Sequence, residues 1–197
     1  YLWTNDHQKL ICFPTQKTLM QNFNKNIPYY LIVVTIFILL KFGFTFANTN
    51  DLAFLLKPTN QLVELLTGSH SIYLSGNGYF YEQLNILIDK SCSGFNFWVL
   101  CFLLFSYLTV NHFDRSIHKL LTIPAVLTGA YMLTLFVNAS RIFASIVVQR
   151  QTKNIFHDQQ HFIHETIGIM TSLTFLILAY ILIEKLLTRQ RHHAKLA

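Results

Sequence analysis

The sequence predicts an all-α integral membrane protein, a four-span helical bundle with a re-entrant or amphipathic segment and a small extracytoplasmic hairpin. The apolar residues come in long runs, which is typical of a polytopic membrane protein. Only 12% of the 197 residues are charged, about half the usual share of a soluble domain, and the mean hydropathy is +0.39. The basic residues flank the apolar runs, as membrane topology requires, so the net charge of +6 does not predict a nucleic-acid partner.

The predicted spans cover residues 27–47, 94–110, about 120–141 and 163–187. The first has about 21 residues, which at about 1.5 Å each cross roughly 30 Å of hydrocarbon. The third has Pro124 in its first turn, where proline is tolerated, and we expect its helix to continue to about Arg150. A polar loop over 149–161 then leads into the fourth span.

The segment between the first two spans, residues 48–91, is mixed in composition. Its first half has apolar residues at helical spacing, interrupted by Lys57 and Pro58, and it is too short and broken to span a bilayer. We expect a surface-lying or re-entrant helix pair there. In the second half, Gly76-Asn77-Gly78 lies between aromatic and β-branched runs, which predicts a small hairpin.

The distribution of basic residues predicts the orientation. They cluster before the first span, between the second and third, and after the fourth, at Lys25, Arg115, Lys119, Arg189 and Arg191. The positive-inside rule then places both termini in the cytoplasm and residues 48–91 and 142–162 outside. Arg150 and Lys153 fall in the second outer segment, and they weaken this bias without reversing it.

Three parts are expected along the chain: a cytoplasmic N-terminal segment over 1–26, a membrane-embedded domain over 27–187 and a basic cytoplasmic tail over 188–197. Met20 opens the stretch that leads into the first span, so we expect it to be the true start and 1–19 to be extra sequence or a fragment end. The first span lacks a small-x-small site after Ala47, which favours an uncleaved anchor over a cleaved signal.

Three reactive residues, Cys92, Arg141 and His164, each lie at an end of a predicted span, and this topology brings all three to the outer face. Cys92 opens the second span and is followed by the small residues Ser93 and Gly94, which leave the thiol uncrowded. Unpaired N–H groups at a helix N-terminus favour a thiolate, and Lys90 adds a nearby positive charge. The competing interpretation is a small interfacial residue, the role we expect mid-span for Cys101.

Arg141 ends the third span, where a charge near hydrocarbon costs a few kcal/mol and therefore suggests a partner or a function. It would stabilise a thiolate or the oxyanion of a tetrahedral intermediate, and the alternative is an anchor that snorkels to lipid phosphate. Asn138 lies one helical turn earlier on the same face. We expect it to orient Arg141 or to donate to the same oxyanion.

His164 opens the fourth span, and an imidazole there can take the thiol proton and later protonate a leaving amine. The alternative is a polar cap on an interfacial helix. His157 and His161 would share one face with His164 if the stretch is helical, and three imidazoles can bind zinc. However, the sequence after His164 lacks the second histidine of HExxH, so we expect no metal and no other cofactor.

These residues resemble the exosortase/archaeosortase family of membrane cysteine transpeptidases, in a compact form similar to exosortase K. The matching features are Cys92-Ser93-Gly94 opening a span, Asn138-x-x-Arg141 at a span end, and His164 starting the last span. The resemblance implies that Cys92 is the nucleophile, His164 the proton-transfer residue and Arg141 the stabilising cation. It further implies membrane-anchored substrates with PEP-CTERM-like C-terminal sorting signals, transfer to a surface acceptor through a thioester, and residence in the bacterial cytoplasmic membrane.

Two other functions fit the composition. A non-enzymatic membrane assembly or accessory protein would keep its function when Cys92 is replaced by alanine. A metal-dependent membrane hydrolase using the three histidines would bind zinc and lose activity with a chelator. The sequence predicts neither the sorting-signal motif nor the oligomeric state.

Overall fold

The computed structural model describes residues 16–113, 115–152 and 160–196. Four long helices in these ranges are apolar enough to cross a membrane, as the sequence predicts. They are α1 (Gln16–Phe46), α3 (Phe95–His112), α4 (Ser116–Thr152) and α5 (Gln160–Leu196). The corresponding candidate spans are Lys25–Phe46, Lys90–His112, Ser116–Gln149 and Thr166–Arg189.

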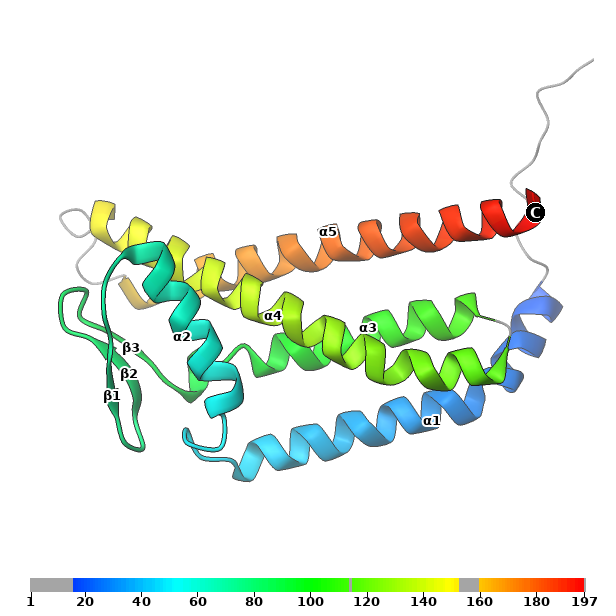
Figure 1. Ribbon diagram of the computed structural model, residues 1–197, viewed down its shortest axis with the longest axis horizontal. Coiled ribbons are helices and arrows are strands. Elements are labelled where there is room, and N and C mark those ends of the chain that lie inside the picture. Colours follow the sequence, from blue (N-terminus) through cyan, green and yellow to red (C-terminus); the bar gives the residue numbers. More distant parts are fainter. Residues whose placement is uncertain (1–15, 114, 153–159, 197) are drawn as a thin grey trace, which may run out of the picture.

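Helix α3 forms the centre of the bundle and contacts α1, α4 and α5. Within the span Lys90–His112, 56% of the most apolar window is buried, against 6% for the α1 and α5 spans. A helix that is apolar all round is stable when it is surrounded by other helices, and α3 has this composition. The exposed apolar side chains of α1 and α5 suit contact with lipid. Figure 1 shows these long helices running side by side, with successive ones reversed in direction.

Helix α2 (Ala53–Thr67) packs against α4 at one end of the bundle (Figure 1). It is a single helix, so the expected pair of helices separated at Pro58 is wrong. A proline inside a helix leaves the carbonyl four residues earlier without its usual N–H donor. Here that carbonyl belongs to Phe54, and the Tyr131 hydroxyl of α4 donates to it at 2.7 Å. The helix therefore continues through the proline because a neighbouring helix supplies the missing hydrogen bond.

A three-stranded antiparallel sheet lies beyond α2 at the same end of the bundle, which we call the sheet end (Figure 1). Its strands are β1 (Ile72–Leu74), β2 (Gly78–Tyr81) and β3 (Ile86–Ile88), in the order β1-β2-β3. Strands β1 and β2 form the predicted hairpin around Gly76-Asn77-Gly78, with Leu74 opposite Gly78. The third strand was not predicted, and it leads directly toward Cys92.

A polar network fastens α2 to the sheet. The Ser71 hydroxyl and backbone N–H donate to one Glu64 oxygen at 2.7 and 2.8 Å, and these bonds lower the pKa of the Glu64 carboxyl. The Asn60 amide donates to the Ser71 hydroxyl and accepts a hydrogen bond from the buried Tyr81 hydroxyl, each at 2.8 Å. A depressed carboxyl pKa stabilises the fold above the ordinary glutamate pKa, and this contribution is lost as the pH falls through the lowered value. At neutral pH this network therefore stabilises the packing of α2 against the sheet.

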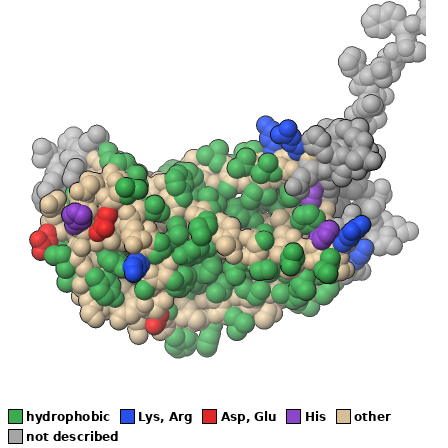
Figure 2. All heavy atoms as spheres, in the orientation of Figure 1, with side chains coloured by type: hydrophobic (Ala, Val, Ile, Leu, Met, Phe, Trp, Pro, Cys, Tyr) green, Lys and Arg blue, Asp and Glu red, His purple; other side chains and the backbone are tan. Residues whose placement is uncertain are grey.

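The two ends of the bundle differ in charge, and apolar side chains cover much of the surface between them (Figure 2). The segment that joins α1 to α3 at the sheet end has more acidic than basic residues, namely Asp51, Glu64, Glu82 and Asp89 against Lys57 and Lys90. The opposite end, which we call the turn end, holds the α3–α4 connection with Arg115, and basic side chains gather there in Figure 2. Basic residues next to apolar spans are the signal on which the positive-inside rule depends.

Candidate functional site

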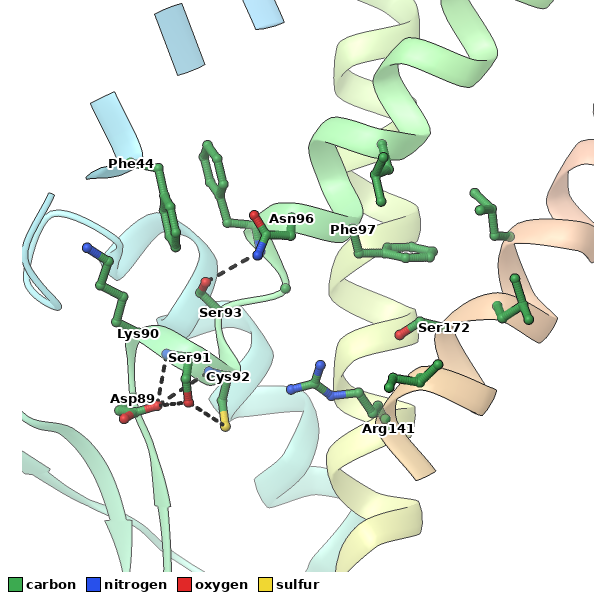
Figure 3. A pocket seen from close by; sticks show the side chains of 17 residues that line it. Phe44, Asp89, Lys90, Ser91, Cys92, Ser93, Asn96, Phe97, Arg141 and Ser172 are labelled. Carbon is green, nitrogen blue, oxygen red and sulfur yellow. Dashed lines mark hydrogen bonds between the residues drawn. The ribbon is translucent and has the colours of Figure 1, made fainter. Parts of the chain in front are cut away.

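A pocket of about 1070 Å³ opens at the sheet end of the bundle. Its lining includes Cys92 and Gly94 ahead of α3, Arg141 of α4 and Gly168 of α5, together with Phe44 of α1. Two of the three predicted reactive residues therefore share one cavity, although they are far apart in the sequence. Figure 3 shows their side chains from close by.

Cys92 lies in a short 3-10 turn, Lys90–Cys92, directly before α3, and its thiol is free and half-buried. Asp89 caps this turn, as short side-chain acceptors do at helix starts. Its carboxylate accepts from the backbone N–H groups of Ser91 at 2.9 Å and Cys92 at 3.4 Å. It also accepts from the Ser91 hydroxyl at 2.6 Å. Because that hydroxyl donates its proton to Asp89, it meets the Cys92 sulfur, at 3.8 Å, as an acceptor of the thiol proton.

Asp89 is a site residue that the sequence analysis did not assign. The signal was present, since a capping Asp just before a helical turn is a common N-terminal pattern. The turn has only three residues and is followed closely by the long apolar helix α3, so the capping pattern did not stand out as a separate feature of the sequence.

Lys90 lies next to the cysteine in the sequence, but its side chain points toward α1 (Figure 3). Its ammonium group donates to the backbone carbonyl of Ala47, just after the end of α1, at 2.7 Å. It also lies 4.8 Å from the centre of the Phe44 ring, within cation–π range. The expected role beside the thiolate is therefore replaced by a structural one, which joins the Cys92 turn to the first span.

Asn138 holds the Cys92 turn from the other side. Its side-chain amide donates to the backbone carbonyl of Cys92 at 2.6 Å. Gly94 lies directly against it with a φ of 71°, and a Cβ at Gly94 would come within 3.0 Å of the Asn138 side chain. Position 94 therefore favours glycine for both its backbone conformation and its lack of a side chain. Asn138 therefore contacts the Cys92 backbone, a partner that was not expected, and its predicted roles toward Arg141 or the oxyanion stay predictions.

Arg141 reaches from α4 into the pocket, and its guanidinium points toward Cys92 (Figure 3). Its Nε is buried and has no hydrogen-bond partner among the described residues. Gly168 of α5 lies against the arginine stem, because a Cβ there would meet Arg141 Cδ at 3.3 Å. Arginine carries five N–H donors and no acceptor, so its group in this pocket suits an anion or a developing oxyanion.

Residue 164 lies in the first turns of α5, one turn before Gly168. Positions four apart share a helix face, so residue 164 lies on the side of α5 that Gly168 turns toward Arg141. The His164 and His161 side chains and all of His157 lie outside the part of the chain whose side chains are described. The zinc site of the alternative function consists of these same three histidines and so lies outside the described side chains. Among the described residues, no group of three His, Cys, Asp or Glu side chains could hold a metal ion.

Comparison with known proteins identifies the chain by family. Residues 26–181 match the family of transmembrane exosortases (Exosortase_EpsH), and the match includes Cys92, Asn138, Arg141 and His164. Searches of curated proteins and of solved structures found no match. The match covers well over half of the chain, and members of this family are generally transpeptidases. The chain therefore belongs to the transmembrane exosortase family.

Proposed function

We propose that this protein is a membrane cysteine transpeptidase or peptidase that cleaves PEP-CTERM-like C-terminal sorting signals of exported proteins. The observation that carries the proposal is the pocket shared by the Cys92 thiol and the Arg141 guanidinium. A nucleophile and a fixed cation in one cavity are two of the groups that acyl transfer needs. Family membership supplies the reaction class.

In the first half of the proposed reaction, Cys92 passes its proton to the His164 imidazole, and the thiolate attacks the carbonyl carbon of the scissile peptide bond. A C–S bond forms while the carbonyl electron pair moves to oxygen, and Arg141 stabilises the resulting oxyanion. When this intermediate collapses, the C–N bond breaks and His164 returns the proton to the leaving amine. The exported protein is then held on Cys92 as a thioester.

In the second half, an amine of a surface acceptor, or water, attacks the thioester carbonyl. The C–S bond breaks, the acyl group passes to the attacking group, and the proton released goes through His164 to the Cys92 thiolate. Asp89 and Asn138 hold the backbone of Cys92 in place for both attacks. Such positioning matters because reaction rates depend steeply on the placement of reacting atoms.

The proposed location is the bacterial cytoplasmic membrane, with the sheet end on the extracytoplasmic side and both chain termini in the cytoplasm. The charge difference between the two ends of the bundle supports this orientation. A substrate anchored in the same membrane would reach the site from within the bilayer or at its surface. Anchoring both molecules in one membrane raises their effective concentration.

The test is processing of an exported, tagged reporter protein that ends in a PEP-CTERM-like tail, which we call the reporter. Cys92→Ala removes the nucleophile, and we expect the cleaved form of the reporter to disappear. Cys101→Ala is the matched control, since Cys101 is buried in the middle of α3, away from the pocket. Trapping the reporter as a thioester on Cys92 would identify the nucleophile directly.

The other functions predict different results in the same assay. Full processing by Cys92→Ala would contradict cysteine catalysis. Loss of processing with a chelator and retention with Cys92→Ala would favour a metal-dependent hydrolase using the histidines. An assembly or accessory protein would leave the reporter intact in every variant.

A further inference from the structure

We infer that a groove between α3 and α5 binds the membrane-spanning apolar helix of the substrate, on the C-terminal side of the scissile bond. This inference rests on the proposed function and assigns the part of the substrate that the pocket receives within the bilayer. The groove, which we call the α3–α5 groove, is lined by Phe97 and Leu100 of α3 and by Ile169, Ser172, Leu173 and Leu176 of α5.

The α3–α5 groove is continuous with the proposed site, because the same cavity is also lined by Cys92 and Arg141. Along α5 the lining runs from Gly168 to Leu176, which corresponds to about 12 Å of helix rise. That length is a substantial part of the roughly 30 Å hydrocarbon thickness. The cavity therefore extends from the reacting groups along the direction in which the spans cross the membrane.

The opposite side of the pocket, between α1 and α3, is tied by polar contacts and ring packing. Lys41 of α1 donates to the Asn96 side chain of α3 at 2.8 Å, and Lys90 donates to the carbonyl that follows α1. The rings of Phe44 and Phe95 stack with their centres 4.3 Å apart. A substrate helix that approaches from lipid would have to break these contacts on the α1 side. On the other side, the described α5 side chains that line the pocket are apolar or small and polar.

The lining of the groove suits a helix. Leu100, Ile169 and Leu173 are 54%, 67% and 50% exposed, so they are free to pack against another apolar surface. Helices associate in lipid through close packing, which a small residue such as Ser172 permits. The chain that continues from a scissile bond into hydrocarbon must satisfy its own backbone hydrogen bonds, and a helix does so. The scissile peptide bond precedes the substrate helix in the chain, so a helix bound in this groove would place that bond level with Cys92.

Filling the groove should therefore slow processing without touching the reacting groups. We expect Leu173→Trp to reduce reporter processing about tenfold or more, since displacement of a substrate by ångströms has large effects on rate. Leu178→Trp is the matched control, because Leu178 lies on another face of the same helix, outside the pocket, and is 56% exposed. Its processing should stay within about twofold of the wild type.

A second measurement does not depend on catalysis. A photo-cross-linking amino acid replaces Leu173, or Leu178 as the control, in the full chain carrying Cys92→Ala and co-expressed with the reporter. We expect a covalent adduct with the reporter tail from position 173 and not from position 178. Equal adducts from both positions, adducts only with lipid, or adducts only with a second copy of this chain would each overturn the inference.

The two proposals fail in different ways. If Cys92→Ala still processes the reporter, the proposed function is wrong. If Cys92→Ala abolishes processing while Leu173→Trp and Leu178→Trp process the reporter at the same rate, the proposed function is supported and the groove does not bind the substrate helix. Expression and gel-filtration profiles of the tryptophan variants in detergent separate a filled groove from a misfolded chain.

Discussion

Cys92 is held through its backbone and not through its thiol. Asp89 accepts from the Cys92 N–H, and Asn138 donates to the Cys92 carbonyl at 2.6 Å. Among the residues whose side chains are described, the sulfur makes only a long contact, with the Ser91 hydroxyl. Both polar groups of the Cys92 peptide backbone are thus fixed while the reactive atom remains free for substrate, which is the arrangement that a nucleophile needs.

Asn138→Ala removes the donor to the Cys92 carbonyl, and we expect it to lower reporter processing up to about 100-fold, because the thiol loses its position relative to Arg141. Loss of this partly buried hydrogen bond should also destabilise the fold by about 1 kcal/mol. Ser140→Ala is the control, since the Ser140 hydroxyl donates to the Phe136 carbonyl within α4. Processing by Asn138→Ala at the rate of Ser140→Ala would contradict this role.

The sequence predicted that Asn138 would orient Arg141 or donate to the oxyanion, and it did not predict the hydrogen bond to Cys92. Helical spacing shows only which residues share a face, and it therefore linked Asn138 to Arg141 on its own helix. The observed partner, Cys92, lies 46 residues away. That pairing depends on how α3 and α4 pack, which no local pattern contains.

Helix α2 depends on a hydrogen bond from another helix. Tyr131→Phe removes the donor to the Phe54 carbonyl, and we expect it to lower the free energy of unfolding by about 1 kcal/mol. Pro58→Ala restores a backbone N–H that can bond to the same carbonyl. In the double variant, loss of the tyrosine hydroxyl should therefore cost much less than in the wild type.

Thermal unfolding in detergent measures this coupling. Cys101 is fully buried, so its reaction with a thiol-specific dye reports unfolding once Cys12 and Cys92 are replaced by alanine. The four proteins of the cycle are compared in this background. Equal destabilisation by Tyr131→Phe with and without Pro58 would show that the hydroxyl does not replace the missing helical donor.

The elements differ in how far the sequence predicts them. The four spans follow directly from long apolar runs, because hydrocarbon leaves few other structures open to them. The continuity of α2 could not be predicted, because it depends on Tyr131, 77 residues away from the carbonyl that it bonds. Strand β3 was missed because no Gly or Pro separates it from β2, and its three residues, Ile86–Ile88, are too few to show a period by themselves.

The direction of the whole bundle in the membrane can be tested with exposed positions at its two ends. Glu82 lies at the sheet end and Arg115 at the turn end, and both are exposed. In a chain whose native cysteines are replaced by alanine, we expect a membrane-impermeant maleimide to label Glu82→Cys in intact cells. Arg115→Cys should react only after the cells are permeabilised. The reverse pattern would place the proposed site in the cytoplasm.

The hydrogen bond from Lys90 to the Ala47 carbonyl connects the sulfur-bearing turn to a helix that mostly faces lipid. Helices exposed in this way adjust their tilt to the thickness of the surrounding membrane. Because Lys90 is only two residues from Cys92, we expect such an adjustment of α1 to shift the sulfur. Membrane thickness should then affect the rate of processing.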